Sequence, residues 1–133
     1  MTDHAKKISE LKELSETLLK VHKILLNFQT ETYETLHAKK LTVYEVFNLT
    51  LQHPDFQWLR SLSKIAVEID GGVAKAKTDL TALDAHVKAE LRDLFMSEGK
   101  ELDFKNKIQM ASEKNRGLLP ALTDLKNRIA YVH

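Results

Sequence analysis

The chain has 133 residues, 43% of them hydrophobic and 29% charged, which is typical of a single domain, residues 1–133, that buries its own core. Its 20 Lys and Arg and 19 Asp and Glu are scattered along its length, so it lacks the basic stripe of a nucleic-acid-binding protein. Because the chain contains no cysteine, disulfides, thiolate metal sites and cysteine nucleophiles are excluded.

Only 4 glycines and 2 prolines interrupt long segments rich in Leu, Lys, Glu and Ala, the residues that lose least free energy on entering a helix. This composition predicts an all-α protein. We expect a single up-and-down-like helical bundle of five to six helices with a long N-terminal helix. The first, third, fourth and sixth helices should form the core, with the second as a short crossover.

The first predicted helix starts at Thr2 or Asp3 and runs to about His37 without glycine or proline. About 35 residues would make a rod of roughly 50 Å. A compact chain of this length has a diameter of about 36 Å, so the helix either bends or extends to a surface that a partner covers. Its weakest segment is residues 29–35, where three threonines favour a kink. Its apolar stripe comprises Leu11, Leu14, Leu18, Val21, Leu25 and Phe28.

The second helix has a clear start, because Thr42 and Glu45 form a capping-box pattern, and it should end at Gln52 or His53 before Pro54. A third helix is predicted over residues 54–70, stopped by the glycines at 71 and 72. Its expected buried face comprises Phe56, Leu59, Leu62, Ala66 and Ile69, broadened by Trp58, Ile65 and Val67.

Three further helices follow a loop at about residues 73–78. The fourth should end near Ser97, the fifth should cover residues 100–115, and the sixth should follow a break near Gly117. The expected buried residues of these helices are Leu80, Leu83, Val87, Leu91, Leu94, Leu102, Phe104, Ile108, Ala111, Leu118, Leu122, Leu125, Ile129 and Val132.

Two His–Glu pairs are candidate metal ligands. Glu34 and His37, with Glu31 one turn earlier, have the Glu-x-x-His spacing of di-iron bundles, but that site needs a second such motif and two more glutamates. His86 and Glu90 are spaced differently and lie among polar residues. We therefore expect solvent-exposed helix faces, no metal site and no cofactor.

Two other groups of residues are candidates for interaction or ligand contacts. His53, Asp55 and Arg60 lie around Pro54 and could form a polar cluster, but the favoured interpretation is that Asp55 caps the third helix and His53 ends the second. An apolar cavity near Trp58 is the second candidate, with Phe47 and Phe56 as its lining and polar contacts from Tyr33, His37 or Arg60. Aromatic residues at helical spacing are more often core, which is what we expect of Tyr44, Phe47, Phe56, Trp58, Phe95 and Phe104.

The block HPDFQWLRSLSKIAVEID, residues 53–70, resembles a block in small bacterial all-helical proteins of uncharacterised function. The resemblance covers about a quarter of the chain and includes no catalytic motif. It implies a bacterial, all-helical, cytoplasmic protein and assigns no functional residue.

The chain has no apolar run near the roughly 18 residues of a membrane span, and its first 30 residues are amphipathic and charged, unlike a signal peptide. We therefore expect a cytoplasmic protein without a membrane or nucleic-acid partner. The favoured function is non-enzymatic: an interaction or regulatory protein that acts through helix faces, with a homodimer as one form of that interaction. The alternative is a bundle that binds a small apolar ligand in a cavity near Trp58.

Overall fold

Helices account for nearly all of the backbone that the computed structural model describes, namely residues 3–75, 80–96 and 102–130, and no strand occurs within those ranges. The all-α prediction is therefore confirmed. In chain order the elements are α1 (Asp3–His37), α2 (Val43–Gln52), the 3-10 helix η1 (Pro54–Leu59), α3 (Arg60–Lys75), α4 (Thr81–Phe95), α5 (Leu102–Lys114) and α6 (Leu118–Ile129).

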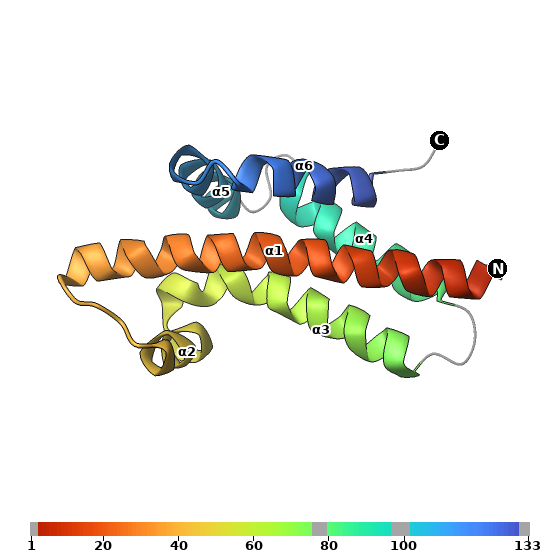
Figure 1. Ribbon diagram of the computed structural model, residues 1–133, viewed down its shortest axis with the longest axis horizontal. Coiled ribbons are helices and arrows are strands. Elements are labelled where there is room, and N and C mark those ends of the chain that lie inside the picture. Colours follow the sequence, from red (N-terminus) through yellow and green to blue (C-terminus); the bar gives the residue numbers. More distant parts are fainter. Residues whose placement is uncertain (1–2, 76–79, 97–101, 131–133) are drawn as a thin grey trace.

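The long helix α1 is the central element of the bundle. It runs along the long axis of the molecule, with α2 and α3 on one side and α5 and α6 on the other (Figure 1). Because it has neighbours on several sides, polar residues next to its apolar stripe are also buried. Ser15 donates a hydrogen bond to Asp70 of α3 at 2.9 Å, and Thr17 donates one to Asp124 of α6 at 3.2 Å.

The predicted stripe of α1 is covered by the chain's own core. Its six residues from Leu11 to Phe28 are at most 4% exposed. The expected kink at residues 29–35 is not seen, because α1 continues through this segment as one rod (Figure 1). The helix spans an elongated molecule and ends at His37. The next residue, Ala38, has a φ of 50°, the left-handed conformation common just after helices.

The sequence predicts α2 correctly and α3 only in part. The N-cap Thr42 and Glu45 form both hydrogen bonds of a capping box, and α2 ends at Gln52 as expected. The segment after Pro54 is a 3-10 helix, and α3 begins at Arg60. The His53 side chain, rather than that of Asp55, caps η1 by accepting a hydrogen bond from the Asp55 N–H at 3.1 Å.

The prediction that glycines 71 and 72 stop the third helix is wrong. Both lie inside α3, which continues to Lys75. Gly72 faces α4, and a Cβ placed there would lie 2.4 Å from a terminal methyl of Leu83. A residue without a side chain therefore lets α3 and α4 approach closely, and this tertiary contact outweighs the low helix propensity of glycine.

The remaining helices complete the core much as predicted. The break near Gly117 is confirmed, because α5 and α6 are separate helices. Ser97, Leu102 and Val132 belong to segments whose side chains lie outside the described part of the structure. Val67 was predicted to be inward-facing but is 70% exposed. The buried residues of α4, α5 and α6, with the N-cap of α4, are Leu80, Asp84, Val87, Leu91, Phe95, Phe104, Ala111, Leu118, Leu122, Leu125 and Ile129.

Candidate functional site

The exposed surface of α2 is the most unusual feature of the described residues. Val43, Tyr44, Phe47 and Leu51 are 89%, 73%, 58% and 52% exposed, and α2 has no buried residue. At 3.6 residues per turn these four side chains fall within an arc of roughly 100°. We call them the α2 face. They form an apolar stripe that points away from the bundle.

The opposite side of α2 attaches it to the rest of the molecule. Val46 and Leu49 are partly buried there, and Leu49 packs against the hydrophobic core. The Arg60 Nε also donates a hydrogen bond to the Thr50 carbonyl at 3.1 Å, which ties the start of α3 to the end of α2. Since α2 is held from one side, its other side stays open to solvent.

Charged residues fix the link between α1 and α2. The Glu34 carboxylate accepts a hydrogen bond from the Leu41 N–H at 2.7 Å, and Lys39 forms an ion pair with Glu45 at 2.5 Å. The hydrogen bond to Lys39, together with one from the Thr42 backbone, lowers the pKa of Glu45. The same contact with Glu45 raises the pKa of Lys39. Both groups are therefore charged at neutral pH. Their ion pair holds the first turn of α2 against the link that follows α1.

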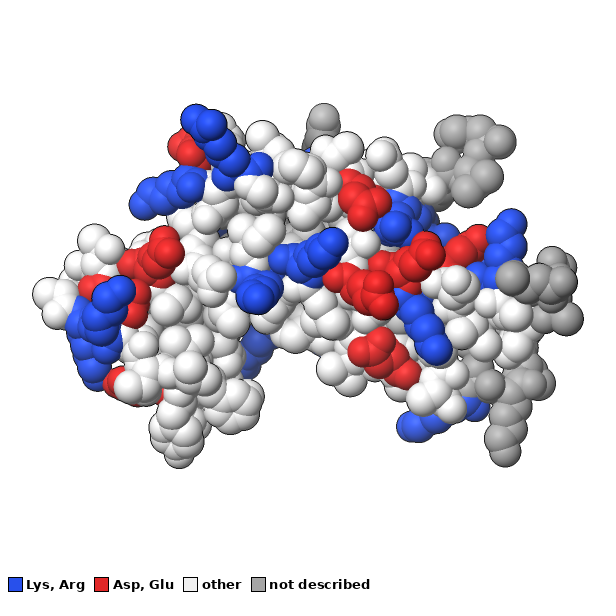
Figure 2. All heavy atoms as spheres, viewed as in Figure 1, with Lys and Arg blue, Asp and Glu red and all other residues white. Residues whose placement is uncertain are grey.

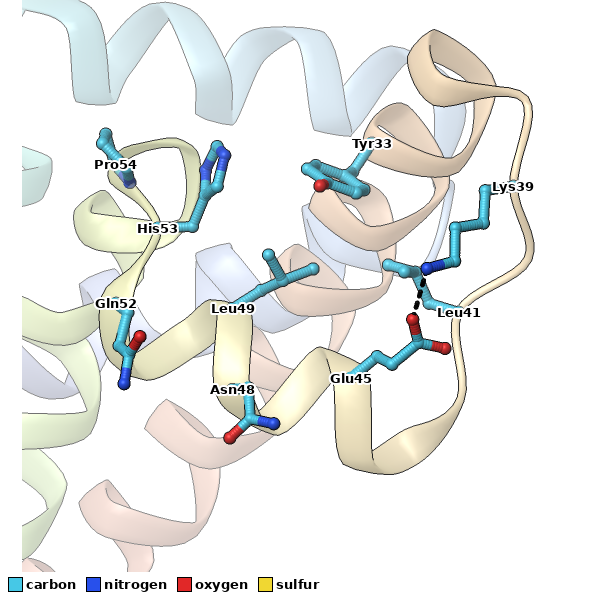
Figure 3. Close-up of a pocket in the computed structure, with 9 residues that line it drawn as sticks. All are labelled: Tyr33, Lys39, Leu41, Glu45, Asn48, Leu49, Gln52, His53 and Pro54. Carbon is cyan, nitrogen blue, oxygen red and sulfur yellow. Dashed lines mark ion pairs between the residues drawn. The ribbon is translucent and has the colours of Figure 1, made fainter.

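A pocket of about 450 Å³ lies between the end of α1 and the inner side of α2 (Figure 3). Tyr33 of α1, Leu49 of α2 and His53 between α2 and η1 point toward its interior. The Lys39–Glu45 ion pair lies at its edge. Its full lining is Tyr33, Lys39, Leu41, Glu45, Asn48, Leu49, Gln52, His53 and Pro54.

Four of the seven predicted candidate residues meet beside this pocket. The Tyr33 ring lies 4.1 Å from the His37 ring, 5.4 Å from His53 and 5.9 Å from Phe56, measured between centroids. Phe56 is fully buried, whereas His37 is exposed. The structure therefore brings Tyr33, His37, His53 and Phe56 together at the α1–η1 contact.

Of the other three candidates, only Asp55 lies next to this group. Trp58 is 9% exposed and belongs to the core, where its ring meets that of Phe104 edge-on at 5.7 Å. The Asp55 carboxylate lies 3.7 Å from the His53 ring, and Arg60 contacts Thr50. Tyr44 and Phe47 were predicted to be core residues, and the structure corrects this because both are exposed.

The charged side chains are mixed over the visible face of the molecule. Figure 2 shows acidic and basic groups side by side along the bundle, whereas most of the lobe at the lower left, where Figure 1 places α2, is uncoloured. Within the described residues, none of the helices is both long enough and apolar enough to span a bilayer. The α2 lobe is thus distinguished by apolar side chains rather than by charge.

Comparison of the chain with protein-family models, curated proteins and solved structures found no match. Functional interpretation therefore depends on the geometry of the molecule. The α2 face was missed at the sequence level because its spacing of four and three residues is also that of a core helix. One feature of the sequence could have indicated an exposed face. The capping box at Thr42 and the proline at residue 54 limit α2 to about ten residues, and so short a helix packs against the core on one side only.

Proposed function

We propose that this protein is a non-enzymatic interaction protein that pairs with a second copy of itself through the α2 face. The observation that supports the proposal is the exposure of four large apolar side chains on one stripe of a ten-residue helix. Apolar residues scattered singly over a surface are ordinary, but a contiguous stripe is typical of an interaction site. The apolar stripe of α1 is buried in the chain's own core and contributes no such surface.

The charge pattern favours a second copy as the occupant. In a two-fold dimer the same patch meets itself, so an ionised residue near its centre would face its own like charge. Residues 46–52 contain no ionisable side chain, and Glu45 is already paired with Lys39. With a net charge of +1, two copies also repel each other little at long range. Two α2 helices can therefore pack against each other without unpaired charge.

The size of the face sets the expected affinity. A ten-residue helix is about 15 Å long, and stable dimers bury about 800 Å² on each partner, more than such a helix offers alone. We therefore expect a reversible dimer with a dissociation constant of about 1–100 µM rather than an obligate one.

Sedimentation velocity across a dilution series from about 500 µM to about 1 µM tests the proposal, since this range brackets the expected dissociation constant. The wild-type chain should shift from dimer to monomer on dilution. Phe47→Glu places a charge at the centre of the paired face and should leave a monomer at every concentration. Because Phe47 is exposed, circular dichroism should show an unchanged helical fold.

Val67→Glu provides the matched control. Val67 is an exposed β-branched residue of α3 outside the α2 face, so the same change of charge should leave the dimer intact. A wild-type chain that is monomeric at about 500 µM, well above the expected dissociation constant, would contradict self-association. A dimer that survives Phe47→Glu would contradict its placement on α2.

The pocket at the α1–α2 junction supports small-ligand binding as a second candidate function. Its volume of about 450 Å³ lies in the range of small-molecule sites, and it combines apolar Leu41 and Leu49 with polar Tyr33 and His53. Native mass spectrometry of the purified chain tests this function directly. A constant added mass would support it, and the bare chain mass would count against a tightly retained ligand.

A further inference from the structure

Glu68, His86 and Glu90 form a cluster of metal-ligand atoms at the contact between α3 and α4, remote in sequence from the α2 face. The His86 Nε2 lies 3.3 Å from the Glu68 Oε2 and 2.7 Å from the Glu90 Oε1. One ligand atom from each residue lies within 4.8 Å of the other two. We propose that these three side chains bind a divalent first-row transition metal ion, with Zn²⁺ as the probe that best matches them.

The helix packing explains why the three residues meet. Gly72 permits a close approach of α3 to Leu83 of α4. Glu68 lies one turn before Gly72 on α3, and His86 lies about one turn after Leu83 on α4. His86 and Glu90 are four residues apart and therefore project from the same face of α4. Core residues of α3 and α4 hold the two helices at this spacing, so the ligand atoms converge before any ion arrives.

The distances suit a zinc ion. Zn²⁺ binds His nitrogen and carboxylate oxygen at about 2.0–2.2 Å, and in a tetrahedral site neighbouring ligand atoms are about 3.4 Å apart. The Glu68–His86 distance of 3.3 Å already matches that separation, and the His86–Glu90 distance of 2.7 Å is shorter than it by about 0.7 Å. Lys64 lies 4.0 Å from the other Glu68 oxygen, Oε1, so Oε2 faces His86.

Electrostatics also favour a cation at this place. Two carboxylates that converge on one point repel each other, and a divalent ion between them removes that repulsion. The side chains of Glu68, His86 and Glu90 are 26%, 62% and 31% exposed, so an ion can enter from solvent and water can complete its coordination. An imidazole ligand selects zinc-like ions over Mg²⁺ and Ca²⁺, which prefer oxygen alone.

Isothermal titration calorimetry of the full chain with ZnCl₂ tests this site. We expect one Zn²⁺ per chain and a higher melting temperature in its presence, because the ion bridges two helices. His86→Gln, Glu90→Gln and Glu68→Gln should each weaken binding by more than about tenfold. All three variants change solvent-accessible side chains, so circular dichroism should show that they fold.

His37→Gln is the matched control, because it removes an exposed histidine of α1 that also has a glutamate, Glu34, one turn away. This variant should bind Zn²⁺ like the wild type. Absence of binding at about 1 mM Zn²⁺ overturns the proposal, as does binding that survives His86→Gln. Unchanged affinity in Glu68→Gln overturns the site that bridges α3 and α4, and equal affinity for Mg²⁺ shows a nonspecific acidic cluster only.

Discussion

The indole N–H of Trp58 donates a hydrogen bond to the Gln29 side-chain oxygen at 2.9 Å inside the core. Gln29 is 7% exposed and directly follows Phe28, the last residue of the buried α1 stripe. A polar residue at this inward position looked like a weak point of α1 when only the sequence was considered. Instead it satisfies the one polar atom of the chain's only tryptophan, because buried indole groups need an acceptor.

Gln29→Ala should therefore destabilise the protein by about 1–3 kcal/mol, because it leaves the buried indole N–H without an acceptor. Urea unfolding followed by Trp58 fluorescence measures this loss. Gln57→Ala, which removes an exposed glutamine one residue before Trp58, should change the free energy of unfolding by less than about 0.5 kcal/mol. Equal stability of the two variants would show that the Gln29–Trp58 hydrogen bond contributes nothing.

Adjacent glycines of α3 should respond differently to alanine. A Cβ added at position 71 would meet no neighbouring atom within 4 Å. Gly71→Ala should therefore stabilise the protein by about 0.5–1 kcal/mol, because alanine has the higher helix propensity. Gly72→Ala should gain less stability than Gly71→Ala, by up to about 1 kcal/mol, because its Cβ would force the terminal methyls of Leu83 to move. Thermal and urea unfolding of both variants checks the difference, and equal gains in stability would contradict the close α3–α4 contact.

The elements that were predicted correctly are those determined by local chemistry. The α1 stripe and the Thr42–Glu45 capping box depend on residues three or four apart, and the sequence displays that spacing directly. The continuation of α3 through Gly72 depends on Leu83, which comes from another helix. Nothing near residue 72 in the sequence signals that contact, so local propensity predicts a stop there.

The candidate sites were less predictable for a related reason. Tyr33 and His53, two candidates predicted from the sequence, line the α1–α2 pocket. Tyr44 and Phe47 were assigned to the core, because helical spacing cannot distinguish an inward apolar face from an outward one. Only the packing of Leu49 against the core decides which side of α2 is exposed. Likewise, the His86–Glu90 pair is visible in the sequence, but its third partner, Glu68, belongs to a different helix.

The capping box should control the local stability of α2. Because α2 buries no residue fully, Thr42→Ala should lower its stability by about 1 kcal/mol and speed amide exchange in residues 46–52 about fivefold. Amide exchange in α1 and α3 should not change, because the buried residues of these helices pack in the common core and not against the Thr42 cap. Hydrogen–deuterium exchange detected by NMR checks this prediction. Thr35→Ala, which removes an exposed hydroxyl on α1, is the control, and global loss of protection would contradict a purely local role for Thr42.

The partly buried His22 should make stability depend on pH. Burial lowers the pKa of His22 below its usual value of 6.5, so the folded state holds the ring neutral where the unfolded chain already binds a proton. The unfolded state then binds more protons between the folded pKa and about 6.5, and the free energy of unfolding increases with pH in that window. The neutral His22 ring therefore makes its full contribution to the free energy of unfolding above about pH 6.5, and that contribution is lost as the pH falls through the pKa of the folded state.

His22→Gln removes this titration without adding a charge. The free energy of unfolding of the wild type should therefore fall more than that of His22→Gln when the pH is lowered from about 7.5 to about 5.5. This expectation does not depend on how much the two proteins differ in stability at the higher pH. Urea unfolding at several pH values measures both curves. Thr35→Ala, a change of an exposed residue without a titratable group on the same helix, should run parallel to the wild type. If His22→Gln also runs parallel, burial of the His22 ring does not determine the pH dependence.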